Sequence, residues 1–265
     1  MERESTKAVS GTGRQGERRV VEVARLEVAG YLGRDAQVLR TPEREFVALS
    51  VGTTASWRDA DQQRHERTLW VKVLAFGEAA EPLKDLKKGA PVYVAGPLTY
   101  DRWDSAQGPR HAPVVRVTER TGEVQAAPMP GGQFARVMLS GVLAKDAALN
   151  RGEDDQRSSA RLWVQARTGH VVVVQGPLVP HIAERLKAGH GVHLEGRLEL
   201  HRWQDGAGKA HERVTVVVGG PDTQIRVDRT PLALPGLEPK PAAPAVALDP
   251  PAPIQERGRP DRTRR

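Results

Sequence analysis

The chain lacks cysteine altogether, which removes several kinds of chemistry. Disulfide bonds, thiol catalysis and zinc sites built on cysteine are excluded. Hydrophobic runs are short, and none approaches the roughly 20 residues that a membrane-spanning helix needs. The first residues, MERESTKAVSGTGRQGERR, have no apolar stretch of the kind that a secretory signal contains. No residues assemble a nucleophile, a base and an orienting group. We therefore expect a cytoplasmic protein that is not an enzyme, does not bind a membrane, and needs no metal or cofactor.

Aromatic residues are also scarce, with 5 Trp, 3 Tyr and 3 Phe in 265 residues. Even so, the segment TASWRDADQQRHERTLWVKVLAFG (54–77) holds two tryptophans and a phenylalanine among arginines and a lysine. Rings beside cations are typical of a surface that stacks flat groups and holds negative charge. The formal net charge of +7 and the pI of about 10 likewise favour a polyanionic partner.

Between residues 22 and 119, apolar and polar residues alternate between turn signals, which predicts β-strands. The clearest runs are VARLEVAGYL, EFVALSVG, LWVKVLAFG, APVYVAGPL and HAPVVRVTE. A helix is expected after the third run, at EAAEPLKDLKKG (78–89), with Pro82 in its first turn and Gly89 at its end. Five strands with a helix in this position follow the order of the OB-fold, a small Greek-key barrel.

The second half of the chain repeats the first. ARLEVAGYLGRDAQVL corresponds to ARVMLSGVLAKDAAL, and LKKGAPVYVAGPLTYDRWDSAQG to LKAGHGVHLEGRLELHRWQDGAG. The second copy is shorter mainly where the first carries the loop around Trp57, so this loop is predicted to be an insertion into a hairpin. The predicted fold is all-β with two tandem OB-fold barrels. The predicted parts are a disordered arm (1–23), a first barrel (24–121), a linker (122–134), a degenerate second barrel (135–228) and a disordered, basic, proline- and alanine-rich tail (229–265).

The motifs of the first barrel, GYLGRDAQVLRTPEREFVALSVGT, WRDADQQRHERTLWVKVLAFGEAAE, LKKGAPVYVAGPL and DRWDSAQG, resemble the bacterial single-stranded DNA-binding protein family. The resemblance covers about residues 25–119 and extends more weakly to the second copy. It implies a protein that coats and protects single-stranded DNA in replication, recombination or repair. Two barrels in one chain are similar to the double-barrel members of this family, and this implies a homodimer with four barrels.

By the same resemblance, four rings stack on bases: Trp57, Trp70, Phe76 and Trp103. Trp70 and Phe76 have the same parity along one strand, opposite the apolar residues Val71, Val73 and Ala75. Both rings therefore face the groove or both face the core, and Phe76 is as suited to the core as to a base.

Cations next to these rings are expected to contact phosphates, namely Arg58, Lys72 and Arg102, with Lys88 at the end of the helix. The second copy keeps only Arg202 and Trp203, so it either extends the path of the strand or mainly completes the oligomer. Glu78 stands where the family commonly has a lysine, which weakens the basic lining at one point.

The end of the chain, QERGRPDRTRR, is net basic and lacks the acidic tip with which many family members recruit replication and repair proteins. Recruitment of such partners is therefore not predicted. Two alternatives stay open at this stage. One is an OB-fold scaffold that serves oligomerisation and recruits partners, and the other is RNA binding.

Overall fold

The computed structural model describes residues 21–58, 62–105, 108–151, 158–204, 210–220 and 222–231. The strands of the first half are β1 (Val23–Leu32), β2 (Gln37–Arg40), β3 (Glu45–Arg58), β4 (Arg64–Phe76), β5 (Pro91–Ser105), β6 (Gly108–Val117) and β7 (Glu123–Gln125). Those of the second half are β8 (Phe134–Leu143), β9 (Ala148–Asn150), β10 (Ser159–Ala166), β11 (Thr168–Gln175), β12 (His190–Gln204), β13 (Ala210–Val218) and β14 (Gln224–Pro231). The helices are the 3₁₀-helix η1 (Gly77–Leu83) and the α-helix α1 (Val179–Arg185).

The strands follow the alternating pattern of the sequence. In β1, Ala24, Leu26 and Val28 are buried, whereas Arg25 and Glu27 between them are partly exposed. Successive side chains of a strand point to opposite faces, so this alternation places one set of side chains in the core. The predicted all-β fold is confirmed.

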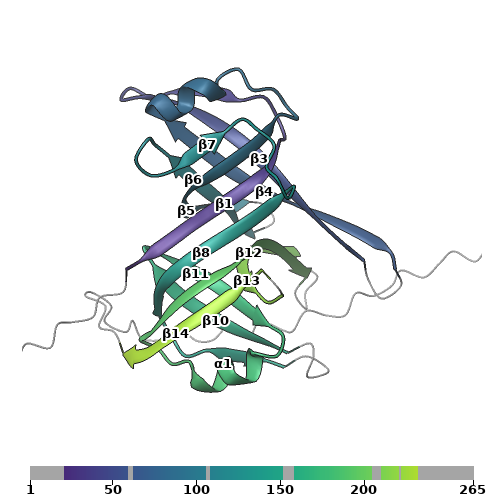
Figure 1. The fold of residues 1–265 in the computed structure, drawn as a ribbon, viewed down its shortest axis with the longest axis vertical. Helices are drawn as coiled ribbons and strands as arrows, with labels where there is room; N and C mark the ends of the chain where they lie inside the picture. Colours follow the sequence, from purple (N-terminus) through teal and green to yellow (C-terminus); the bar gives the residue numbers. More distant parts are fainter. Residues whose placement is uncertain are drawn as a thin grey trace, which may run out of the picture.

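Each half of the chain closes into a five-stranded barrel with the same connectivity (Figure 1). In the first barrel the order around the wall is β1-β3-β4-β6-β5, and β5 pairs with β1 to close it. In the second it is β8-β10-β11-β13-β12, closed by the pairing of β12 with β8. All neighbours are antiparallel except β4 with β6 and β11 with β13. This is the strand order of the OB-fold.

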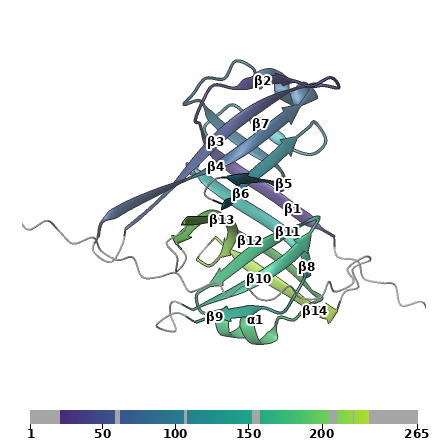
Figure 2. The same cartoon turned by 180° about the vertical axis from the view of Figure 1, so that it is seen from behind.

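The two barrels are joined by pairing between one strand of each. Antiparallel pairing runs from Val23↔Ser140 to Ala29↔Phe134, so β1 and β8 lie side by side where the barrels meet (Figures 1 and 2). A continuous antiparallel layer, β7-β5-β1-β8-β12-β14, therefore spans both barrels. The buried side chains of both halves likewise form one large cluster.

One repeated glycine permits the barrels to close tightly. A Cβ atom on Gly30 would lie 2.1 Å from the carbonyl oxygen of Gly52, and one on Gly141 would lie 2.1 Å from that of Gln165. A side chain at either position would force adjacent strands apart. Gly30 and Gly141 occupy equivalent places in the two copies, so the same requirement holds in both barrels.

The helix predicted at residues 78–89 is wrong in type and length. The chain forms the short 3₁₀-helix η1, with Pro82 inside it. Beyond η1, Leu86 N–H bonds to the Leu83 carbonyl and Ala90 N–H to the Lys87 carbonyl, which are turns of the i to i−3 kind. Because Pro82 has no N–H to donate, it removes one of the few hydrogen bonds that would make this stretch an α-helix. Lys88 thus lies in a turn and not at a helix end.

The predicted Trp57 loop is mostly strand. β3 and β4 pair as far as Arg58↔Arg64, and together they form a two-stranded ribbon that projects from the first barrel (Figures 1 and 2). In the second barrel Arg167, with a positive φ of 55°, joins β10 to β11 directly. The insertion predicted from the sequence therefore lengthens a hairpin instead of forming an irregular loop.

Two boundaries also differ from the prediction. Residues 123–125, expected to belong to a linker, form β7, which pairs with Tyr93–Ala95 at the open edge of β5. β14 continues to Pro231, three residues past the predicted end of the second barrel. The predicted arm up to residue 20 and the predicted tail from residue 232 lie outside the described residues.

None of the helices in the described ranges is long and apolar enough to cross a membrane. Within the same ranges, no three His, Asp or Glu side chains are grouped so that they could hold a metal ion.

Candidate nucleic-acid interface

The indole of Trp70 packs against two glycines. Its side chain is 49% exposed, although it belongs to a central strand of the first barrel. A Cβ atom on Gly33 would lie 2.4 Å from the indole ring, and one on Gly52 would lie 2.7 Å from it. Gly52 is the residue of β3 opposite Trp70. The six-membered ring of the indole is thus supported by bare backbone, and the side chain lies on the outer face of the barrel.

The contact between Gly52 and the Trp70 indole leads to a prediction for Gly52→Ala. The added methyl group must displace the indole, so we expect acrylamide to quench more of the tryptophan fluorescence than in the wild type. The increase should be absent when Gly52→Ala is combined with Trp70→Phe. Gly169→Ala is the matched control, because a Cβ there meets nothing closer than a side-chain oxygen of Gln165 at 3.6 Å. Unchanged quenching in Gly52→Ala would show that the indole does not rest on this glycine.

Lys72 shares the outer face with Trp70 but is already paired. Its ammonium group donates to Asp101 Oδ2 at 2.7 Å, and Asp101 Oδ1 also lies 4.0 Å from a guanidinium nitrogen of Arg116. The sequence analysis missed Asp101, although this residue directly precedes Arg102 and Trp103. A phosphate that binds Lys72 must therefore compete with a carboxylate.

Phe76 belongs to a small second cluster on the outer face. Its ring centroid lies 5.3 Å from that of Phe46, and the guanidinium of Arg44 lies 4.5 Å from the Phe76 ring. Both rings pack on buried residues, namely Ala48, Leu74 and Val114. Phe76 thus packs against the barrel with part of its ring and remains partly exposed. Phe46 and Arg44 were not singled out from the sequence, and their proximity to Phe76 follows only from the β3–β4 register.

Trp103 lies on β5, in the hairpin that β5 forms with β6. Its side chain is 50% exposed, and the neighbouring Arg102 is also exposed. Arg102 is opposite His111 of β6, and β6 is in contact with β13 of the second barrel. Burial, together with the guanidinium groups of Arg102 and Arg213, lowers the pKa of His111. Arg102 and Arg213, one from each barrel, therefore both lie near His111 where β6 meets β13.

The remaining candidates are less closely grouped. Arg58 donates to the backbone carbonyl of Gln62 at 2.9 Å near the end of the ribbon. In the ribbon, Trp57 is opposite His65. On β12, Arg202 is opposite Glu212 of β13, and Trp203 is opposite His211. The side chains of Trp57, Arg202 and Trp203 lie outside the described part of the structure.

Lys88 lies in a turn beside the connection from β1 to β2, where the next residue, Gly89, donates its N–H to the Leu32 carbonyl. Its backbone N–H donates to Asp35 Oδ1 at 2.9 Å, and the ammonium of Lys87 lies 3.3 Å from Asp35 Oδ2. The hydrogen bond from Lys88 and then that from Lys87 hold the pKa of Asp35 below its usual value. The structure thus brings Trp70, Lys72 and Phe76 onto one face of β4 and places Lys88 in a separate turn.

The second barrel has a half-buried ring in a place that corresponds to Ser50 of the first. Trp163 of β10 is opposite Val171, and the ammonium of Lys145 lies 3.4 Å from the centroid of its ring. The indole is thus covered by a cation, unlike that of Trp70.

Comparison with known proteins agrees with this geometry. Residues 23–125 match the profile of the single-strand binding protein family. Among solved structures, a deletion mutant of the single-stranded DNA binding protein from Thermus aquaticus is 21% identical with a TM-score of 0.59, covering 82% of this chain and 98% of its own. The wild-type Thermus aquaticus protein is 21% identical with a TM-score of 0.54, covering 76% of this chain and 95% of its own. These two structures share the fold across both barrels. The match to the single-strand binding protein family thus covers the strands of the first barrel and β7.

Proposed function

We propose that this protein binds and protects single-stranded DNA without strong sequence preference. The observation that carries the proposal is the exposed indole of Trp70, supported by glycines on the outer face of a barrel that matches the profile of this family. Any base offers a flat π-face, and one base stacked on an aromatic ring contributes about 1–3 kcal/mol with little dependence on sequence. The net charge of +7 favours the same partner.

In this proposal the stacking rings are Trp57, Trp70, Phe76 and Trp103. The phosphate contacts come from Arg58, Lys72, Lys88 and Arg102. Arg202 and Trp203 extend the path onto the second barrel. Lys72 binds a phosphate only when it leaves Asp101, so we expect its contribution to be smaller than that of Arg102.

We further propose that the protein is a double-barrel member of the family and forms a homodimer. The layer shared by the barrels carries apolar side chains on its outer face, including Tyr93 and Phe134, whose ring centroids are 6.5 Å apart, and Met138, which is 37% exposed. Arg25, Glu27 and Arg136 lie between them in the same registers. A mixture of apolar groups and opposite charges suits a second copy of the same face. Sedimentation velocity separates a dimer from a 28.9 kDa monomer.

Titration with oligo(dT), followed by intrinsic tryptophan fluorescence at low and high salt, tests the function. We expect strong quenching, because a base stacks on an indole, and weaker binding at high salt, because each neutralised phosphate of a single strand contributes about −0.7 to the slope of log K against log salt. An RNA oligomer of matching sequence, used as a competitor, separates DNA from RNA preference. If the folded protein shows neither quenching nor binding, the proposal is wrong.

A further inference from the structure

The row of residues that starts at Trp70 on the outer face of the first barrel ends at a carboxylate. Lys72 of β4 is paired with Val114 of the parallel strand β6. Two residues earlier on both strands, Trp70 therefore lies level with Ala112. Ala112 is in turn opposite Asp101 of β5. Asp101 is thus two strands away from Trp70, which is about 10 Å at the usual spacing of strands.

The second exposed indole lies next to the same carboxylate. Leu98 of β5 is buried, so the residues of opposite parity, Asp101 and Trp103, have their side chains on the outer face. Successive residues of one face are about 7 Å apart along a strand. A strand of nucleic acid that stacks on both Trp70 and Trp103 must therefore pass close to Asp101.

Asp101 holds two cations on this surface. Its Oδ2 accepts a hydrogen bond from the Lys72 ammonium at 2.7 Å, and its Oδ1 lies 4.0 Å from a guanidinium nitrogen of Arg116. The side chains of Lys72, Asp101 and Arg116 are 45%, 35% and 50% exposed, so a ligand can reach all three. A phosphate at this place meets cations whose charge is partly balanced and a carboxylate that repels it.

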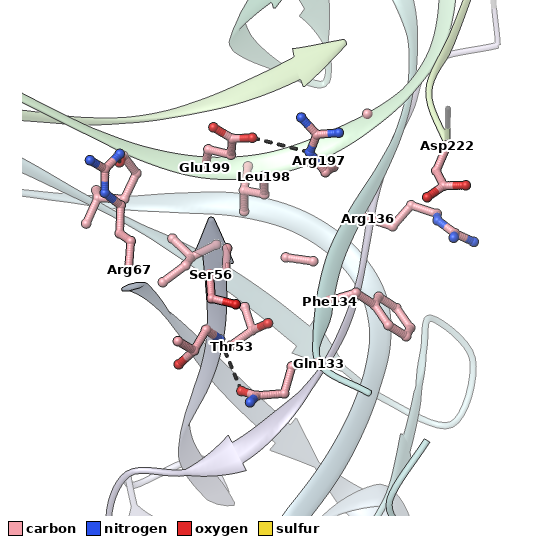
Figure 3. Close-up of a pocket in the computed structure, with 16 residues that line it drawn as sticks. Thr53, Ser56, Arg67, Gln133, Phe134, Arg136, Arg197, Leu198, Glu199 and Asp222 are labelled. Atoms are coloured by element: carbon pink, nitrogen blue, oxygen red, sulfur yellow. Dashed lines mark hydrogen bonds and ion pairs between the residues drawn. The ribbon is translucent and has the colours of Figure 1, made fainter. Parts of the chain in front are cut away.

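The fold does not require this network. The second barrel closes with the same strand order, although the three charged residues are replaced there by Val171, Val217 and His201. On β12 of that barrel, Glu199 instead pairs with Arg197 of its own strand at 3.3 Å, beside a pocket of about 530 Å³ where the ribbon meets the second barrel (Figure 3). Exposed ion pairs also contribute little to the free energy of folding. The place of Asp101 between two indoles therefore points to a role in binding.

We propose that Asp101 attenuates strand binding, because it holds Lys72 away from phosphates on the path between Trp70 and Trp103. The inference rests on the proposed single-stranded DNA binding and adds a residue that acts against it. Lys72 must break its hydrogen bond to Asp101 before it donates to a phosphate, and the carboxylate then faces the same phosphate. The bases therefore hold the strand on this surface more than the phosphates do, and the strand leaves more readily than it would from an unopposed lysine.

Asp101→Asn tests this role, because asparagine has the size of aspartate but no charge. For oligo(dT) long enough to cover both indoles, we expect about tenfold tighter binding at low salt. The slope of log K against log salt should become more negative by about 0.7, since one more phosphate is neutralised. Loss of a purely structural ion pair would not steepen this slope. Fluorescence anisotropy of a labelled oligomer measures both quantities, after circular dichroism and thermal unfolding show a wild-type fold.

Matched variants separate this role from a general gain of positive charge. Glu184→Gln removes an exposed carboxylate from α1, at the end of the second barrel away from the first (Figures 1 and 2). It should bind like the wild type, because exposed charges more than about 10 Å apart are largely screened at 0.1 M salt. Asp101→Glu keeps the charge and should also stay close to the wild type. Lys72→Ala should have little effect alone but should remove most of the gain in Asp101→Asn.

Wild-type affinity and slope in Asp101→Asn, while Trp70→Ala weakens binding, would overturn the attenuating role and leave the proposed function intact. The role is also wrong if Asp101→Asn binds more weakly than the wild type, or if adding Lys72→Ala leaves its gain unchanged. If neither the wild type nor Asp101→Asn binds any oligomer, the proposed function fails, and the role of Asp101 fails with it.

Discussion

Replacing both Trp70 and Trp103 by alanine is expected to weaken oligo(dT) binding by about 30-fold or more. Each ring should contribute about 1–3 kcal/mol through stacking, so the pair contributes at least about 2 kcal/mol, and every 1.4 kcal/mol corresponds to a factor of ten. Both indoles are about half exposed, so their removal takes little from the core. Most of the fluorescence quenching should disappear as well. Fluorescence anisotropy of a labelled oligomer measures the affinity without relying on the tryptophans.

The control is Trp163→Phe in the second barrel, where the ring is half-buried beneath Lys145. This change alters the number of tryptophans but should leave the affinity within about twofold of the wild type. Wild-type affinity in the double variant, with an intact fold, would show that the outer face of the first barrel is not the stacking surface. A loss as large in Trp163→Phe would place the main contact on the second barrel.

The second large effect concerns the buried histidine between the barrels. His170 of β11 is only 2% exposed, its Nδ1 lies 3.1 Å from the hydroxyl of Tyr100 on β5, and its Nε2 lies 3.1 Å from the Thr168 hydroxyl. Burial lowers the pKa of His170 to about 4, and a hydrogen bond to the backbone of Ala166 acts in the other direction. Burial also raises the pKa of Tyr100, so the phenol stays protonated.

The sign of the effect follows from these values. Above about pH 6.5 His170 is neutral in both the folded and the unfolded chain and makes no difference to stability. Between about pH 6.5 and 4 the unfolded chain takes up a proton that the folded chain does not, so acid favours unfolding. The free energy of unfolding should therefore fall as the pH drops through this window, by up to about 3 kcal/mol. Urea unfolding at pH 7.5, 6, 5 and 4.5 measures the change.

His170→Gln is the informative control, because glutamine is polar but does not titrate. The variant should be less stable at pH 7.5 and should lose less stability on acidification than the wild type. His111 and His201 also have pKa values lowered first by burial, so part of the slope should remain. An identical slope in the wild type and in His170→Gln would mean that His170 takes up its proton in the folded state.

Much of the fold could be predicted from the sequence, because its signals are local or repeated. The run VARLEVAGYL is β1 from its first residue to its last. The repeat predicted two similar units, and the matching positions of Gly30 and Gly141 reflect one close strand approach in each. Parity favoured an exposed Trp70 without deciding it, since Val71, Val73 and Ala75 form the apolar face of the same strand.

Other features depend on contacts between distant segments and could not be read in advance. Asp101 meets Lys72 only because β4, β6 and β5 are neighbours in the barrel wall. The partly packed state of Phe76 depends on the register that brings Phe46 opposite it. The sequence predicted a loop in place of the ribbon because the residues there are polar on both faces. This is typical of paired strands that do not cover a hydrophobic core. The pairing of Arg136 with Arg197, 61 positions later in the sequence, likewise follows only from the register of β8 and β12.

The β1–β8 pairing has a consequence for how the two halves can change. Because both strands belong to one chain, their association does not weaken on dilution, and each half meets the other at the high effective concentration of a tethered partner. A substitution in one half also leaves the other untouched, whereas in an assembly of identical subunits every copy would carry it. Covalent linkage therefore permits division of labour. The first barrel can keep its aromatic residues while the second accumulates other substitutions. The β1–β8 pairing holds the two barrels together in either case.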